Sequence, residues 1–121
     1  MGKTIITILI CMLLFGSCFA VEPIIFTKAS INKNEINVTF ANSGIRYLIE
    51  LNDKRIGINE YGQNLTFKKT DKLRLSEKHA FYLVTYIAIN DKCYLQIKET
   101  KIDEKSGEEI KRAYYRTLEK E

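Results

Sequence analysis

Two side chains of this 121-residue chain are candidates for nucleophilic catalysis, Cys93 and His79. A thiol next to an imidazole can attack a carbonyl, but the reaction also needs a group that orients the imidazole and a site that stabilises an oxyanion. The sequence marks neither, and a single histidine offers no metal-binding cluster. We therefore expect a protein that is not an enzyme and holds no metal or cofactor. Cys93 is expected to be a small buried hydrophobic residue, with intermolecular pairing or redox sensing as the alternative.

Basic side chains gather in two stretches that are candidates for binding a partner. The first, "KKTDKLRLSEKH" at 68–79, reads as an exposed loop, and the second, "KRAYYRTLEK" at 111–120, interleaves Lys111 and other bases with two tyrosines. The first is favoured, because five Lys or Arg stand against two acids there and exposed loops commonly carry binding residues. The predicted partner-binding residues are Lys68, Lys69, Lys72, Arg74, Lys78, Arg112, Tyr114, Tyr115 and Arg116. The alternative is that these residues are a solvated loop and ordinary cross-strand pairs.

The charge of these stretches indicates the kind of partner. Positive surfaces with aromatic residues bind acidic protein faces, anionic lipid headgroups or glycans, and they also bind nucleic acid. An exported chain rarely meets nucleic acid, so we expect another envelope or secreted protein, or an anionic surface, and no nucleic acid.

Export itself is indicated by the first 20 residues. Lys3 precedes an apolar run, "IITILICMLLF" at 5–15, and the small-residue stretch "GSCFA" follows. This is the pattern of a secretory signal peptide, and the run is shorter than the roughly 20 apolar residues that span a bilayer. We expect residues 1–20 to be removed as a signal peptide and residues 21–121 to form a single β-rich domain.

The end of this leader can be cut in two ways. Phe15-Gly16-Ser17-Cys18 resembles a bacterial lipobox, and cleavage before Cys18 would leave an acylated cysteine that anchors the protein to a membrane. Cys18-Phe19-Ala20 also approximates an ordinary small-x-small site, and cleavage after Ala20 would release the protein. Both cuts stay open, and the register of Cys18 favours the lipid anchor.

The remaining chain of about 100 residues is long enough for one hydrophobic core. Without Lys3 it carries 18 basic and 15 acidic side chains, a net charge of +3, mixed along the chain. Cys93 is then the single cysteine of the mature fold, so no internal disulfide is expected. The sequons at Asn37 and Asn64 matter only in a host that glycosylates exported proteins.

Short alternating runs predict the fold class. "EINVTFA" and "IRYLIEL" each alternate apolar and polar residues, which is typical of strands with one buried face. The apolar run "AFYLVTYIAI" at 80–89 reads as a central strand covered on both faces. Asn-Asp turns at 52–53 and 90–91, and Gly107 in a third turn, predict hairpins. We expect an all-β sandwich or barrel of about seven to eight antiparallel strands.

The last segment is open to two interpretations. Ser106 and Glu109 form a capping box before apolar residues at helical spacing, which predicts a helix over 107–120 and a small α+β domain. The same residues alternate as a strand with Ile110, Tyr114 and Leu118 on one face, and two adjacent tyrosines favour the strand.

These features together predict an exported, non-catalytic binding protein of the cell envelope, most simply a small bacterial lipoprotein. The alternative is a secreted or periplasmic inhibitor or immunity-type protein that blocks an enzyme by inserting its basic loop into an acidic cleft. Fold class alone does not decide between them. An enzyme that uses Cys93 is the third hypothesis.

Overall fold

The computed structural model describes residues 24–59 and 62–121, so the leader and both cleavage sites lie outside the described residues. Strands are the only regular secondary structure in these residues, and turns or irregular segments connect them. This confirms the all-β prediction, and the number of strands exceeds the seven or eight expected. No helix in this part of the chain is long and apolar enough to cross a membrane. The strands are β1 (Phe26–Asn32), β2 (Glu35–Phe40), β3 (Leu48–Leu51), β4 (Lys54–Ile58), β5 (Asn64–Lys68), β6 (Leu73–Ser76), β7 (Ala80–Ile89), β8 (Lys92–Ile102), β9 (Glu109–Thr117) and β10 (Glu119–Lys120).

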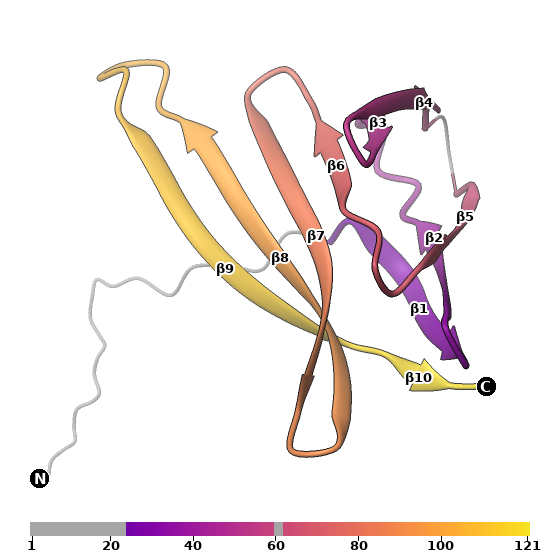
Figure 1. Ribbon diagram of the computed structural model, residues 1–121. Helices are drawn as coiled ribbons and strands as arrows, with labels where there is room; N and C mark the ends of the chain where they lie inside the picture. The colour runs from indigo at the N-terminus through magenta and orange to yellow at the C-terminus, as the bar shows by residue number, and fades with distance from the viewer. Residues whose placement is uncertain (1–23, 60–61) are drawn as a thin grey trace, which may run out of the picture.

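The strands form two sheets that pack together as a small β-sandwich (Figure 1). One sheet has the strand order β10-β1-β2-β5, and the other has the order β4-β3-β6-β7-β8-β9. Neighbouring strands are antiparallel except β10, which runs parallel to β1. The chain crosses between the sheets after β2, β4, β5 and β9, so the order of strands in space differs from their order in sequence.

The core fills the space between the two sheets. Alternation in β2 places Ile36, Val38 and Phe40 on the inner face, where all three are buried. From the larger sheet, Leu73, Leu75 and Val84 are fully buried. Each such side chain contributes roughly 1.5–3 kcal/mol through removal from water, which stabilises a domain whose one cysteine in the described residues, Cys93, is free.

The predicted turns are confirmed. Asn52, Asp53, Asn90 and Asp91 all have positive φ angles, between 49° and 67°. Two consecutive residues of this kind make the tight turn whose twist matches that of a β-hairpin. They connect β3 to β4 and β7 to β8. Gly107, between β8 and β9, has φ of 76°, the left-handed conformation predicted for it.

The C-terminal segment is a strand, so the helix over 107–120 is wrong. Residues 109–117 form β9, which pairs with β8 over its full length. Leu118 then enters the core and β10 joins the other sheet. Arg116 supports this crossing, because its guanidinium donates hydrogen bonds to the backbone carbonyls of Phe26 (3.0 Å) and Thr27 (3.2 Å) in β1.

The prediction of one continuous loop over 68–79 is wrong. Residues 73–76 form strand β6, which lies between β3 and β7 in the larger sheet. The pattern Leu73-Arg74-Leu75 has the alternation of a half-buried strand, and both leucines are buried. The surrounding lysines make the stretch look like a loop, but the buried leucines decide its structure.

The interpretation of residues 80–89 is half right. β7 is central in its sheet, between β6 and β8. Only one of its faces is covered by the other sheet: Tyr82 and Val84 are buried, whereas Phe81 is 40% exposed. No described residue forms a layer over the outer face, so its apolar side chains line the surface of the molecule.

A buried tyrosine gives the fold a testable pH dependence. Burial, together with the charges of Glu77 and Glu99, raises the pKa of Tyr47 to about 12. The same causes, burial first, raise the pKa of Tyr82. Since an unfolded tyrosine has a pKa of about 10, the unfolded chain loses these protons first as the pH rises. The resulting contribution to stability is complete below about pH 10 and is lost as the pH rises through about 12.

Replacing Tyr47 with phenylalanine should therefore weaken the alkaline loss of stability. Denaturant unfolding from about pH 9 to about pH 12 should show a fall in the free energy of unfolding that is smaller in Tyr47→Phe than in the wild type. The difference should reach roughly 2–3 kcal/mol, from a pKa shift of about two units. Parallel curves for the two proteins would show that Tyr47 ionises as it does in the unfolded chain.

Candidate binding groove

The outer face of the larger sheet carries a basic groove across β6, β7, β8 and β9. Its cavity volume is about 440 Å³. We call it the basic groove and define it by the residues that line it: Arg74, Phe81, Leu83, Lys98, Glu99, Thr100, Lys111, Arg112 and Ala113. Four of these nine carry a positive charge, and they come from both sides of an apolar floor.

Strand register explains how these residues meet. Side chains directly opposite each other in neighbouring antiparallel strands lie on the same face. Two such rows cross the four strands. One row is Arg74, Leu83, Lys98 and Ala113, and the next is Ser76, Phe81, Thr100 and Lys111. Three inter-strand spacings of about 4.8 Å give the groove a width of roughly 14 Å.

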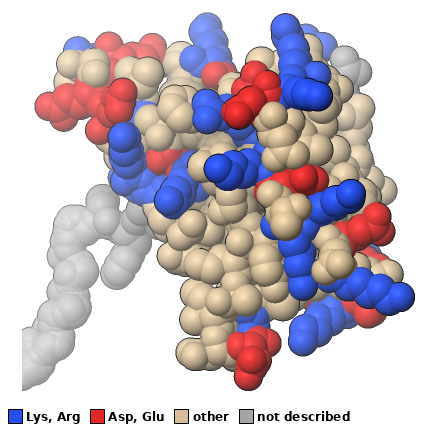
Figure 2. All heavy atoms as spheres, in the orientation of Figure 1, with Lys and Arg blue, Asp and Glu red and all other residues tan. Residues whose placement is uncertain are grey.

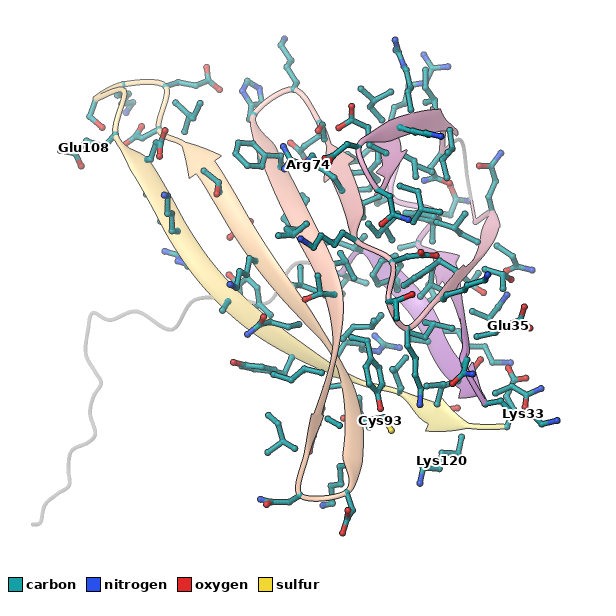
Figure 3. All side chains as sticks on the ribbon, viewed as in Figure 1. Lys33, Glu35, Arg74, Cys93, Glu108 and Lys120 are labelled. Carbon is teal, nitrogen blue, oxygen red and sulfur yellow. The ribbon has the colours of Figure 1, made fainter. Side chains whose placement is uncertain are left out.

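The floor of the groove is apolar and carries a cation at its edge. The guanidinium carbon of Arg74 lies 5.9 Å from the centre of the Phe81 ring, and Arg74 extends from β6 toward β7 (Figure 3). A guanidinium over an aromatic face is attracted by the ring while its outer edge stays available to a ligand. Leu83, half-buried, continues the floor beside Phe81.

Glu50 of β3 lies directly opposite Arg74 on the same sheet face and offsets part of the positive charge of the groove. Glu99 is the one acid that lines it, but this side chain is 7% exposed and accepts a hydrogen bond from the Tyr114 hydroxyl (3.3 Å). Among the described residues, the ion pair of Lys111 is a long one to Glu109 (3.9 Å) on the same exposed strand, and such a pair contributes little. Figure 2 shows Lys and Arg side chains across this face, with Asp and Glu side chains beside them and a cluster of acids at the upper left, toward the turn between β8 and β9.

The first basic stretch does not form one surface. Lys68 belongs to β5 in the other sheet, and Lys69 in the following turn lies with its Nζ 5.0 Å from the centre of the Tyr86 ring. Lys72 precedes β6, and Lys78 lies in the turn at the opposite end of β6. Of the five predicted bases, Arg74 alone reaches the groove.

Hydrogen bonds connect the turn that contains Lys69 and Lys72 to the β3–β4 turn. Asp71 accepts hydrogen bonds from the Asn52 side chain (2.9 Å) and the Lys68 backbone amide (2.8 Å). These two bonds lower the pKa of Asp71. Asn52 in turn accepts a bond from the Lys72 amide (3.0 Å). This part of the first stretch is thus ordered by its own contacts.

The second basic stretch divides between the two faces of β9. Lys111 lies on the outer face, and Arg112 lines the groove from the next position along this edge strand. Tyr115, also on the outer face, accepts a hydrogen bond from the Gln96 side chain (3.1 Å). Tyr114 and Arg116 are half-buried and make the structural contacts given above. The structure therefore brings Lys111 and Arg112 together with Arg74.

Lys98 lines the groove but was not among the predicted binding residues. This residue is in the middle of β8, in a stretch with mixed charges, and nothing nearby in the sequence marks it. Its position becomes significant because it pairs with Leu83 on one side and Ala113 on the other. Alternation within β8 predicts its outward direction, but only the order of the strands reveals its neighbours.

Cys93 and His79 do not form a catalytic pair. His79 comes just before β7, where its Nδ1 lies 3.2 Å from a Glu104 carboxylate oxygen. Cys93 pairs with Ala88 near the other end of β7 (Figure 3), and its sulfur lies 3.3 Å from the Tyr86 hydroxyl oxygen. Cys93 is half-buried, in keeping with a packing role.

A larger cavity, of about 880 Å³, lies on the opposite side of β7, β8 and β9. Its lining includes four acids, three Lys or Arg side chains and His79. This mixture favours no ligand charge, whereas the basic groove favours an anion. The sequons lie elsewhere, on paired strands of the smaller sheet. The Asn37 amide donates to the Thr66 hydroxyl (2.9 Å), and the Thr39 hydroxyl donates to Asn64 (2.7 Å).

Comparison of the chain with protein-family models, with curated proteins and with solved structures found no match. The geometry and charge of the groove therefore identify the candidate site.

Proposed function

We propose that this protein is an exported, non-catalytic binding protein of the cell envelope that holds an acidic partner protein in its basic groove. The leader and the lipobox-like Phe15-Gly16-Ser17-Cys18 support export and attachment to a membrane through lipid on Cys18. The binding role is supported by one observation above all. Three cations on an outer sheet face, Arg74, Lys98 and Lys111, lie around an apolar floor, and Arg112 adjoins them from the next position of β9.

The shape of the site favours a protein segment over a flat bilayer surface. The apolar floor of Phe81 and Leu83 lies between Arg74 on one side and Lys111 on the other. A segment that enters between them can pair its carboxylates with both sides and cover the exposed part of Phe81. Interfaces of this kind combine a desolvated apolar centre with charged groups at the rim.

A short acidic peptide tests this proposal without knowledge of the natural partner. In the probe, glutamate and threonine alternate and a fluorescent label reports binding by anisotropy. The mature protein should bind the probe at about 0.01 M salt, where charges act over roughly 30 Å. Binding should be lost near 1 M salt, where this distance falls to about 3 Å. A peptide with glutamine in place of glutamate is the matched control. Equal binding of the two peptides would contradict the proposal.

A further inference from the structure

We propose that the free edge of β9 accepts an extended acidic segment of the partner as an additional strand, next to the basic groove. This inference rests on the proposed function and names how the same site holds its partner. β9 is the last strand of the larger sheet, and in the described residues its pairing is with β8 alone. An edge strand presents a row of backbone donors and acceptors that can bind another chain.

The hydrogen-bond pattern identifies which amides are available. The Leu118 amide donates to the Cys93 carbonyl (3.0 Å), so this residue pair is of the hydrogen-bonded kind. Pairs alternate in kind along an antiparallel ladder, and the β8–β9 register runs without a shift from Thr117 to Glu109. The amides and carbonyls of Lys111, Ala113 and Tyr115 therefore point away from β8, toward the free edge.

The same residues have their side chains on the outer face, where the groove lies. Lys111 and Ala113 line the groove, and Tyr115 is 48% exposed. A strand added at this edge would place its own outer-face side chains directly opposite these three residues. A carboxylate opposite Lys111 would form a charge pair, and the small side chain of Ala113 leaves room for a larger neighbour.

Charge selects an acidic segment over a second copy of this chain. β9 carries Lys111, Arg112 and Arg116 against Glu109, so each copy of the strand has a net charge of +2. Two such strands side by side repel each other, because like charges on neighbouring strands are destabilising. An acidic strand would instead meet Lys111, whose ion pair with Glu109 is a long one between two exposed side chains (3.9 Å).

Backbone methylation of the acidic probe tests strand addition on the unaltered mature protein. Two versions of the glutamate-threonine peptide are prepared, one N-methylated at its glutamates and one at its threonines. In an added strand, only one of these two sets of N–H groups faces β9. One version should therefore lose affinity by about tenfold or more while the other keeps it, because methylation removes the donors and introduces a clash.

The outcomes distinguish this inference from the proposed function. Equal affinities of the two methylated peptides, whether both strong or both weak, would overturn strand addition. If the unmethylated peptide still binds in a salt-sensitive way, the groove proposal survives that result. A salt-resistant dimer of the protein alone, seen by sedimentation and abolished by Ala113→Pro but not by Ala113→Val, would assign the edge to a second copy and also overturn strand addition.

Discussion

Reversing Lys98 and Lys111 to glutamate is expected to slow association with the acidic peptide by about tenfold or more at low salt. The two changes bring the charge of the four groove cations from +4 to zero. Both side chains are exposed on the outer sheet face, where substitutions change stability by about 0.5 kcal/mol or less. Stopped-flow fluorescence gives the association rate, and thermal unfolding verifies that the fold is kept.

The matched control reverses Lys33 and Lys120, which changes the net charge of the protein by the same amount. These residues lie at the opposite end of the molecule from Arg74 (Figure 3). If the rate depends on the groove, the control should keep most of the wild-type rate. Equal slowing in both double variants would show that net charge, rather than the groove, drives association.

Cys18→Ala is expected to move the protein completely from the membrane fraction to the soluble fraction. Several acyl chains on one cysteine hold a protein stably on a membrane, whereas removal of the acceptor residue leaves nothing to anchor it. Membrane fractionation followed by intact mass measurement tests this. The wild-type mass should begin at Cys18 with added acyl groups.

A wild-type mass that begins at Val21 without lipid would contradict the anchor and favour the ordinary cleavage after Ala20. Export would still hold in that case, because both cuts remove the charged and apolar part of the leader, residues 1–17. Lys28→Ala is a suitable control, since this exposed side chain lies in the folded domain and has no part in processing.

The sequence predicted the fold class because strand signals are local. Alternation in β2 and the Asn-Asp turns depend on residues next to each other in the chain, and the structure confirms both. Strand β6 was not predicted, because it has only two buried leucines and the basic residues around them are typical of an exposed loop. β10, at Glu119–Lys120, was missed because a two-residue strand has no periodicity to detect.

The candidate site was harder to predict, since it depends on contacts between distant residues. Arg74 and Lys111 were recognised as basic, but neither local pattern indicates that the two lie on one sheet face. Alternation within β8 predicts that Lys98 points outward, but no local pattern marks it as part of a site. Residues 80–89 were expected to be covered on both faces, so Phe81 and Leu83 were not predicted to line a surface groove. The order of the strands in the sheet determines which of these residues are neighbours, and local patterns in a single sequence do not reveal that order.

The most direct test of the central claim is to locate the bound acidic peptide by nuclear magnetic resonance. Titration of the peptide into isotopically labelled mature protein should shift the amide signals of Leu83, Lys98 and Ala113. The signals of Asn37 and Thr66, on the outer face of the smaller sheet, should stay in place. Shifts confined to the smaller sheet, or spread evenly over all lysines, would contradict a binding site in the basic groove.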